Sequence, residues 1–314
     1  MTSVGQQQQL KATAPWRVLG KSVRGAAHER KNSPNQDAIC WIPKSGRGKS
    51  VVLSLADGHG SDRYTRSHIG SQLAVSTSTQ LIADFLAGQA AAGNLSLIKR
   101  AAEQWLPQAL VREWTRAIKE HLSANPFSEA ELDRFATGSS AITPSDHAAT
   151  IVPYGSTLVV AAVTEDFILY LQIGDGEVVI VSDGGEVSQP LVKDERLFAN
   201  ETTSLCAVDA WRDFRVSFQP ITREKPALIL LATDGYPNSF REEAGFLKAG
   251  GDILHTLRAE GASKVRDNLE SWLVHSTTAG SGDDVTLGIL YSVKPPTVQR
   301  PPKSAGTAKR SRGR

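Results

Sequence analysis

The stretch "SLADGHGSDRYTR", residues 54–66, ends a short apolar run abruptly at Asp57-Gly58-His59-Gly60 and then turns polar. Asp-Gly is a common turn pair, because glycine readily adopts the positive φ that a tight turn requires. Carboxylate oxygens are also the ligands that hard divalent cations prefer. The pair alone favours a simple turn over a metal site, so the surrounding segments must decide between the two.

Short segments rich in β-branched and aromatic residues lie on both sides of this stretch and predict strands. The region 156–190 alternates apolar runs with turns, which predicts an antiparallel meander with a hairpin turn at Asp183-Gly184. The other predicted strands are "WRVLGKSVRG" (16–25), "DAICWI" (37–42), "VVLSLAD" (51–57), "WRDFRVSFQP" (211–220), "ALILLATDG" (227–235) and "DDVTLGILYSV" (283–293).

Apolar residues at helical spacing predict helices over 63–88, 95–123 and 246–278. Pro107 predicts a kink or break near Leu106, since proline lacks the N–H that a helix interior needs. Gly261 predicts an interruption of the last helical region. Blocks of strands separated by blocks of helices, without strict βαβ alternation, indicate an α+β fold with antiparallel sheets.

The two ends of the chain differ from its middle. Residues 1–15 are polar and Gln-rich, which predicts a flexible segment, and residues 293–314 form a basic, Pro-rich tail that is expected to be disordered. The basic residues of the tail outweigh the net charge of +2, so residues 1–292 are net acidic. We interpret the tail as a solubilising extension, with contact to an acidic partner as the alternative. No nucleic-acid partner is expected, because no aromatic residue accompanies the charges.

Cysteine usage and hydropathy indicate the compartment. Cys40 and Cys206 cannot make a disulfide framework, and neither belongs to a CxxC pair. The N-terminal residues lack an apolar export core, and no apolar run approaches the length of a membrane span. We therefore expect a cytoplasmic protein with no membrane partner.

Acidic residues recur at the ends of the predicted strands. Asp57, Asp175 and Asp234 each follow an apolar run and each precede a glycine, whereas Asp37 and Asp283 come at or just before the start of a strand. Carboxylates that converge near an apolar core repel one another and are costly to bury, and a divalent cation removes this penalty. A glycine after Asp57 also lets a backbone carbonyl approach the same ion.

Other catalytic signatures are missing from the sequence. It contains no HExxH motif, no zinc-type cluster, no P-loop and no GxSxG elbow. An acid-rich, His-poor set therefore favours a two-metal hydrolase with oxygen ligands. Carboxylates alone leave the substrate open, because nucleases and phosphatases both use this chemistry.

Six segments carry the acidic residues and their neighbours in a fixed order: "RGAAHERKNSPNQDA" (24–38), "LADGHGS" (55–61), "YGSTLVVAAV" (154–163), "LQIGDGEV" (171–178), "LLATDGYPNSF" (230–240) and "SGDDVTLGIL" (281–290). Taken in this order, they resemble the metal-dependent Ser/Thr protein phosphatases of the protein phosphatase 2C family, bacterial type. The resemblance covers about residues 18–292.

This resemblance implies a four-layer αββα sandwich of two antiparallel sheets flanked by helices. Residues 16–292 would form the catalytic domain, with a helical insert at about 94–150. Two Mn²⁺ or Mg²⁺ ions are implied at one end of the sheets. Asp57 would bridge the two ions, and the Gly58 carbonyl would be a ligand of one of them. Asp234 and Asp283 would hold the other ion. Asp37 would support the metal-bound waters, and Asp175 would help to hold a weaker third metal.

The implied reaction is hydrolysis of phosphoserine or phosphothreonine by a water that the metals activate. His59 matches the family's candidate general acid for the leaving oxygen, with an exposed turn histidine as the alternative. Arg30 is the best candidate to grip the phosphate, with Arg24 and Lys31 as rivals, because a guanidinium matches phosphate oxygens.

Two positions depart from the family pattern. Gln36 stands where members often carry glutamate, so it cannot supply charge to a metal, and Asn238 replaces a third-metal acid. The expected partners are phosphorylated Ser/Thr proteins, opposing a Ser/Thr kinase. A catalytically silent phosphoprotein-binding module on the same fold is the alternative, and a two-metal nuclease or small-phosphoester hydrolase is a third interpretation.

Overall fold

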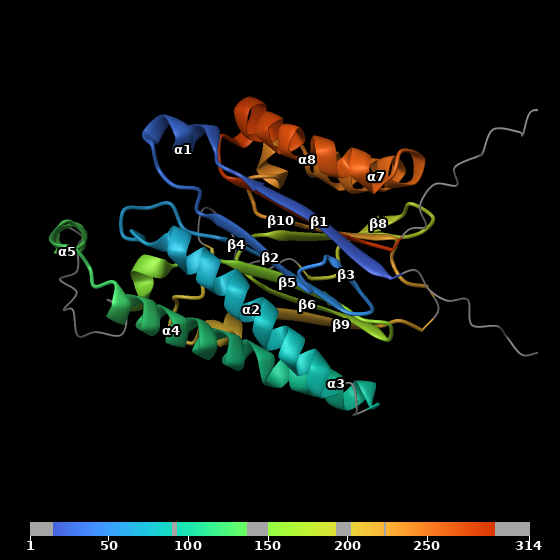
Figure 1. Cartoon of the computed structure of the whole chain (residues 1–314), viewed down its shortest axis with the longest axis horizontal. Coiled ribbons are helices and arrows are strands. Elements are labelled where there is room, and N and C mark those ends of the chain that lie inside the picture. The colour runs from blue at the N-terminus through green and yellow to red at the C-terminus, as the bar shows by residue number, and fades with distance from the viewer. Residues whose placement is uncertain (1–14, 90–92, 137–149, 193–201, 223, 293–314) are drawn as a thin grey trace, which may run out of the picture.

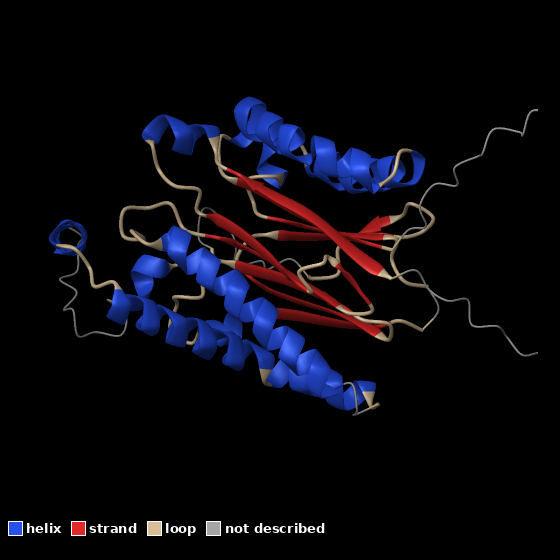
Figure 2. Ribbon diagram, in the orientation of Figure 1, coloured by secondary structure: helices blue, strands red, loops and turns tan. Residues whose placement is uncertain are grey.

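A computed structural model describes residues 15–89, 93–136, 150–192, 202–222 and 224–292. In these residues two β-sheets lie face to face and helices cover the outer side of each, as Figure 1 and Figure 2 show. The predicted α+β fold with a four-layer αββα arrangement is confirmed. The predictions for residues 1–14 and for the tail lie outside the described residues.

One sheet has six strands in the order β3-β1-β11-β10-β7-β8, and the other has five in the order β2-β4-β5-β6-β9. All described strand pairs are antiparallel. The strands are β1 (Trp16–Val23), β2 (Asp37–Ile42), β3 (Arg47–Gly48), β4 (Val51–Asp57), β5 (Leu158–Val163), β6 (Phe167–Ile173), β7 (Glu177–Val181), β8 (Val187–Ser188), β9 (Arg215–Pro220), β10 (Leu228–Ala232) and β11 (Val285–Tyr291).

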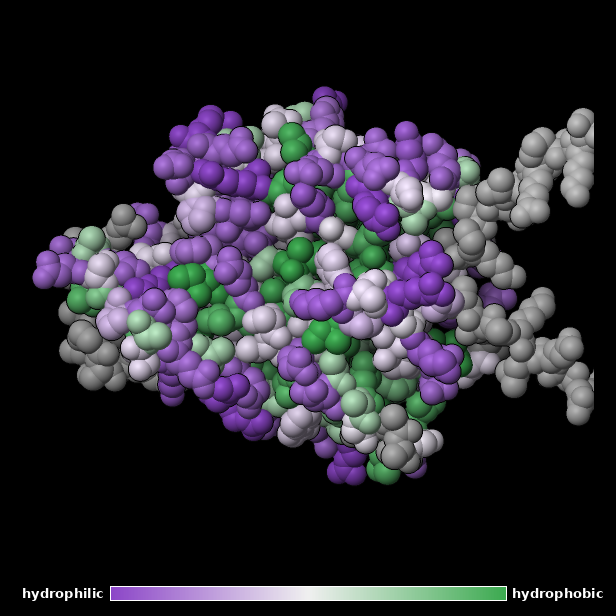
Figure 3. Space-filling view, viewed as in Figure 1, coloured by the Kyte–Doolittle hydropathy of each residue, from purple (hydrophilic) through white to green (hydrophobic). Residues whose placement is uncertain are grey.

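The long helices pack on the outer faces of the sheets. α2 (Ser67–Gln89), α3 (Leu95–Gln104) and α4 (Leu106–Ala124) lie on the side of the five-stranded sheet, and α7 (Glu243–Ala259) and α8 (Ala262–Ser276) cover the six-stranded sheet. Shorter helices are α1 (Ala26–Lys31) and α5 (Glu129–Ala136). In Figure 3 hydrophilic residues dominate over the helices, and hydrophobic surface gathers in the band between the two helical layers.

The ends of the helices follow from local residues. α3 begins after Asn94, whose side chain accepts hydrogen bonds from the backbone N–H groups of Ser96 and Leu97. α4 carries Pro107 in its first turn, where a missing N–H does no harm, so the predicted break lies between α3 and α4. Gly261, with φ +90°, separates α7 from α8 as predicted.

The core explains why several strands are apolar throughout. Each sheet is covered by the other sheet on one face and by helices on the opposite face, so its central strands are buried on both sides. Leu53, Tyr170 and Ile229 fill the space between the sheets. Each fully buried side chain of this size stabilises the fold by about 1.5–3 kcal/mol.

The predicted meander over 156–190 is wrong in part. β5 and β6 pair as expected, but β7 leaves for the other sheet and pairs with β10. The crossing uses Gly174, which has φ +96°, and Gly176, where an added Cβ would lie 3.0 Å from the Ala232 carbonyl oxygen. Gly174 and Gly176 thus turn the chain between the sheets, and Asp175 lies between the two glycines at this crossing.

None of the described helices has the length and the apolar character that crossing a membrane requires.

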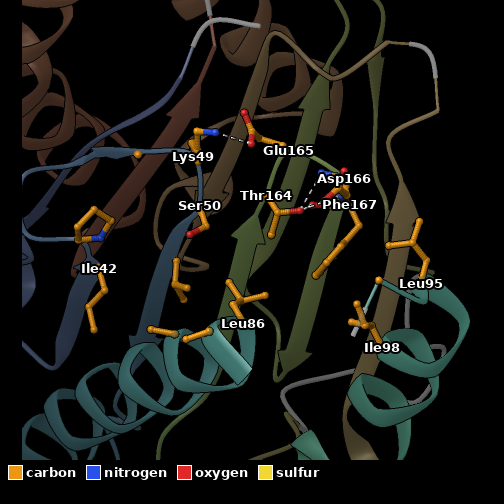
Figure 4. Close-up of a pocket in the computed structure, with 16 residues that line it drawn as sticks. Ile42, Lys49, Ser50, Leu86, Leu95, Ile98, Thr164, Glu165, Asp166 and Phe167 are labelled. Atoms are coloured by element: carbon orange, nitrogen blue, oxygen red, sulfur yellow. Dashed lines mark hydrogen bonds and ion pairs between the residues drawn. The ribbon is translucent and has the colours of Figure 1, made fainter. Parts of the chain in front are cut away.

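An apolar hollow of about 850 Å³ lies beneath the C-terminal end of α2. It is lined by side chains such as Leu86 and Ile98, and Lys49 pairs with Glu165 at its rim (Figure 4). Val52, near the start of β4, lines this hollow, while Asp57 ends the same strand. Val52 is therefore about 17 Å from Asp57 along the strand, at a rise of roughly 3.3 Å per residue.

Candidate metal centre

Four of the predicted acidic residues line one pocket of about 580 Å³. Asp57 is the last residue of β4, Asp234 follows β10, Asp175 lies between β6 and β7, and Asp283 precedes β11. These elements belong to both sheets, so the pocket lies where the two sheets end together. We refer to it below as the acidic pocket.

Asp37 lies beside this group at the start of β2. It is directly opposite Asp57 in the register of β2 and β4, and its side chain is buried. Thr233 Oγ1 donates a hydrogen bond of 2.6 Å to Oδ2 of Asp37, whereas Oδ1 has no hydrogen-bond partner among the described residues. A buried carboxylate oxygen with free lone pairs fits a role toward a cation or its bound water.

The electrostatics of the pocket are unfavourable without a cation. Burial raises the pKa of Asp37 and of Asp57 well above the usual range, and repulsion among the neighbouring carboxylates adds to the shift. Burial, then the charge of Asp175, raises the pKa of Asp234 to about 6. Burial likewise raises the pKa of Asp175. The donor set, all oxygen and crowded with negative charge, fits hard divalent ions such as Mg²⁺ or Mn²⁺.

The backbone at Asp57 and Gly58 is closely packed. A Cβ on Gly58 would lie 2.6 Å from the Ser67 carbonyl oxygen, so no larger residue fits there without a shift. The Asp57 N–H donates to Thr157 Oγ1 at 3.0 Å, and the Thr157 N–H donates to the Asp57 carbonyl at 2.8 Å. Asp57 ends β4, and Gly58 extends the strand as an isolated bridge to Ser156, so the predicted tight turn does not form at this pair. The Asp57 side chain lines the pocket.

His59 also lines the acidic pocket, and its ring is partly buried. Its Nε2 lies 2.7 Å from Ser204 Oγ, and its ring packs against Tyr64 with 4.6 Å between centroids. Burial, then the charge of Arg63, lowers the pKa of His59 to about 4. In this arrangement the imidazole is neutral at pH 7, so the general-acid role stays a prediction.

Arg30 is exposed on α1 and is not among the residues that line the acidic pocket. Of its rivals, Lys31 is exposed, and Arg24 donates to the His28 carbonyl at 3.0 Å. The phosphate-gripping role of Arg30 remains a prediction. The cation that does line the pocket is Arg63, within the opening "DGHGSDR" stretch, and sequence reasoning missed it.

A second missed residue is Asp284, which is 3% exposed. Its carboxylate accepts backbone hydrogen bonds of 2.6 Å from Gly25 and from Gln36, which ties the segment before β2 to the start of β11. His28 lines the acidic pocket, with Nδ1 2.8 Å from Asp284 Oδ2 and Nε2 3.9 Å from Asp283 Oδ1. Within the described part of the chain, His28, Asp283 and Asp284 are the group whose ligand atoms lie within 4.8 Å of one another.

The two positions that depart from the expected pattern make contacts at the site. Gln36 Nε2 donates to the His59 carbonyl at 3.1 Å and to Ser67 Oγ at 2.7 Å, so its side chain holds the segment that follows Asp57. Asn238 Nδ2 donates to Asp234 Oδ2 at 3.1 Å. An amide at each place orients a neighbour instead of adding another charge.

Comparison with known proteins gives one family match. The family described as Protein phosphatase 2C matches residues 24–274. No curated protein matches the chain.

Solved structures with a similar fold are bacterial phosphatases. The S. agalactiae serine/threonine phosphatase is 18% identical with a TM-score of 0.55, over 88% of this chain and 100% of its own. The catalytic domain of the phosphatase PstP, in complex with two manganese ions, is 19% identical with a TM-score of 0.53, over 90% and 100%. PppA of Pseudomonas aeruginosa, a regulatory component of T6SS, is 18% identical with a TM-score of 0.55, over 90% and 99%. At this identity the likeness shows the fold.

Proposed function

The chain belongs to the protein phosphatase 2C family, and from this premise we propose that it is a metal-dependent protein serine/threonine phosphatase. The observation that carries the proposal is the acidic pocket, where Asp57, Asp175, Asp234 and Asp283 come together from both sheets. The raised pKa values of Asp57, Asp175 and Asp234, and the open Oδ1 of the buried Asp37, support the presence of cations there.

Two Mn²⁺ or Mg²⁺ ions are proposed as the cofactors. Asp57, the Gly58 carbonyl, Asp234 and Asp283 would hold them, Asp37 would hold their waters in place, and Asp175 would serve a weaker third ion. When bound, such ions lower the pKa of a water molecule and neutralise phosphate charge.

The remaining pocket residues would act on the substrate. Arg63 is an exposed cation at the pocket, suited to a phosphate oxygen. His59 is held by Ser204 and Tyr64 close to Asp57. A bound phosphate, with its negative charge, raises the pKa of a neighbouring imidazole. Substrate binding would therefore bring His59 closer to the protonated form that a general acid needs.

The test is hydrolysis of a phosphoserine peptide with Mn²⁺, with and without chelator. Wild-type protein should release phosphate only with the metal, and Asp57→Asn should reduce kcat at least a hundredfold. Asp62→Asn is the matched control, because Asp62 is an exposed acid nearby that does not line the pocket.

Three results would reject the proposal. Equal hydrolysis by Asp57→Asn and wild-type protein would remove the metal mechanism. Metal binding without turnover of any phosphopeptide would instead favour the silent regulatory module. Faster cleavage of DNA or of small phosphoesters would assign a different substrate.

The natural setting is also part of the proposal. We propose phosphorylated Ser/Thr proteins as substrates, a Ser/Thr kinase as the opposing enzyme, and a signalling role in the cytoplasm. Cys40 and Cys206 are both free thiols, which is consistent with a reducing compartment.

A further inference from the structure

A second groove, of about 910 Å³, lies next to the acidic pocket. One wall is the face of α4 that carries Arg112, Arg116 and Lys119, and the other wall is the segment from Leu205 to Trp211. The three cations are four and three residues apart, so they lie on one side of the helix. We call this feature the α4 groove.

The charge of the α4 groove is opposite to that of the acidic pocket. Asp209 is its acidic lining residue among those described, and it is paired with Arg212 at 3.5 Å. Lys119 pairs with no carboxylate in the described part of the chain. The groove therefore offers a basic edge to a ligand.

The two arginines have acidic partners on their own helix, of which Glu120 is exposed and Glu113 is partly buried. Glu113 contacts Arg112 at 3.3 Å and Arg116 at 2.9 Å, and Glu120 contacts Arg116 at 2.5 Å. Both guanidinium side chains are more than half exposed. Exposed pairs of this kind are weak, so carboxylates of a ligand can replace them at little cost.

The opposite wall is largely apolar. Leu205 is buried at the base of the segment, whereas Val208 is 90% exposed at the groove. Trp211 adds an aromatic surface to the same wall. A basic edge facing an apolar wall suits an extended peptide with acidic side chains on one side.

One continuous segment joins the groove to the acidic pocket. Thr202 lines the acidic pocket, and Ser204 Oγ lies 2.7 Å from His59 Nε2. The next two residues, Leu205 and Cys206, line the α4 groove. The Leu205 N–H donates to the Ser156 carbonyl at 2.9 Å, and Ser156 forms a β-bridge with Gly58, which anchors this wall beside the end of β4. A peptide with its phosphorylated side chain in the pocket can reach the groove within a few residues.

We propose that the α4 groove binds acidic residues that flank the phosphorylated serine or threonine of the substrate protein. The acidic pocket and its metals would take the phosphate, and Arg112, Arg116 and Lys119 would select for neighbouring Asp or Glu. This inference rests on the proposed function, and it names the substrate class as acidic phosphoprotein segments.

The test compares two fluorescent phosphoserine peptides that differ only in their flanks, one with Asp and Glu and the other with Ser and Gly. Binding is measured by anisotropy in chelator, so that it does not depend on turnover, and kcat/KM is then measured with Mn²⁺. Wild-type protein should bind the acidic peptide on the order of five- to tenfold more tightly, as expected for a few partly screened charges. Raising the ionic strength should reduce this preference.

The double variant Arg116→Gln, Lys119→Gln should bind the two peptides within twofold of each other. The matched control is Lys99→Gln, Arg100→Gln on α3, which removes the same charge from exposed residues outside the groove and should keep the preference.

Each outcome separates the two proposals. Equal binding of both peptides by wild-type protein, or an unchanged preference in the α4 double variant, overturns the groove assignment whatever the activity assay gives. A preference for the acidic peptide that the α4 variant loses, together with no turnover under any metal condition, supports the groove and rejects the phosphatase proposal.

Discussion

At the scale of single residues, the acidic pocket shows how burial and repulsion act on carboxylates. Asp57 and Asp37 face each other across two strands, and Asp234 lies close enough for its charge to raise the pKa of both. The folded protein without metal therefore carries an electrostatic penalty once these groups ionise. A bound divalent cation would offset this repulsion.

Replacing Asp234 by Asn should stabilise the metal-free protein at pH 7.5. The folded-state pKa of Asp234 is about 6, above its ordinary value of 3.8. Below pH 3.8 the group is protonated in both states and contributes nothing. Between the two values a penalty on the folded state grows, and above pH 6 the penalty is complete. Urea unfolding in chelator should thus show an advantage for Asp234→Asn at pH 7.5 that shrinks toward pH 4.

The same comparison in saturating Mn²⁺ should reverse, because the variant loses a ligand. If Asp234→Asn is instead less stable than wild type in chelator at pH 7.5, the crowded-carboxylate account of the pocket is wrong.

Gly58→Ala should destabilise the protein by about 1–3 kcal/mol, the usual effect of forced contacts in a packed site. The added Cβ would meet the Ser67 carbonyl at 2.6 Å, and a backbone atom cannot swing aside. Gly88→Ala is the control, because nothing lies within 4 Å of its Cβ position in α2, and alanine is the better helix former by about 1 kcal/mol. Chemical denaturation of both variants gives the comparison, and equal effects would contradict it.

At the scale of elements, one buried arginine joins three helices. Arg66 is 7% exposed at the start of α2, and its guanidinium donates to Glu131 of α5 at 2.6 and 2.9 Å. It also donates to the Asn125 and Pro126 carbonyls after α4 and to the Tyr154 hydroxyl. This set of contacts holds the end of α4, and with it the α4 groove, against α2.

Glu131→Gln should destabilise the protein by about 3 kcal/mol, because it leaves the buried guanidinium without its counter-charge. The hydrogen bonds from Arg66 lower the pKa of Glu131 to about 2, so the contribution is complete above pH 4.5 and is lost as the pH falls toward 2. Glu103→Gln, which removes an exposed pair with Lys99 on α3, should change stability by less than about 1 kcal/mol. Urea unfolding at pH 7 and pH 3 checks both, and similar values for the two variants would argue against the anchor.

Prediction of the elements from sequence succeeded where the signal was local. The break at Pro107, the interruption at Gly261 and the apolar strands depend on residues within one or two turns of chain. The path of β7 was wrongly predicted, because the alternation of apolar runs and turns is the same whether the next strand joins its own sheet or the opposite one. Pairing with β10, more than forty residues away along the chain, decides which sheet β7 joins.

At the scale of the whole molecule, the proposed metal site draws its residues from both sheets. Asp57 belongs to the five-stranded sheet, and Asp234 and Asp283 flank strands of the six-stranded sheet. A ligand that bridges them binds only the folded sandwich, so it must stabilise the fold as a unit.

Mn²⁺ at about one hundred times its Kd should raise the free energy of unfolding by about 2.7 kcal/mol. Thermal unfolding monitored by circular dichroism should show a higher Tm with Mn²⁺ than with chelator. Asp57→Asn should lose most of this shift and Asp62→Asn should keep it. A metal-induced shift that survives in Asp57→Asn would place the ions elsewhere.

The sequence by itself determined the fold class, most of the helix and strand positions, the family and the set of acidic residues at strand ends. These features depend on local composition, on turn residues and on the order of motifs along the chain. Only the tertiary structure decided which groups meet. In the folded chain Arg63 and His28 line the acidic pocket and Arg30 does not. Asp284 accepts a backbone hydrogen bond from Gly25, and the α4 groove lies beside Ser204. Proximity between distant segments depends on strand register and sheet pairing, and no local pattern encodes these directly.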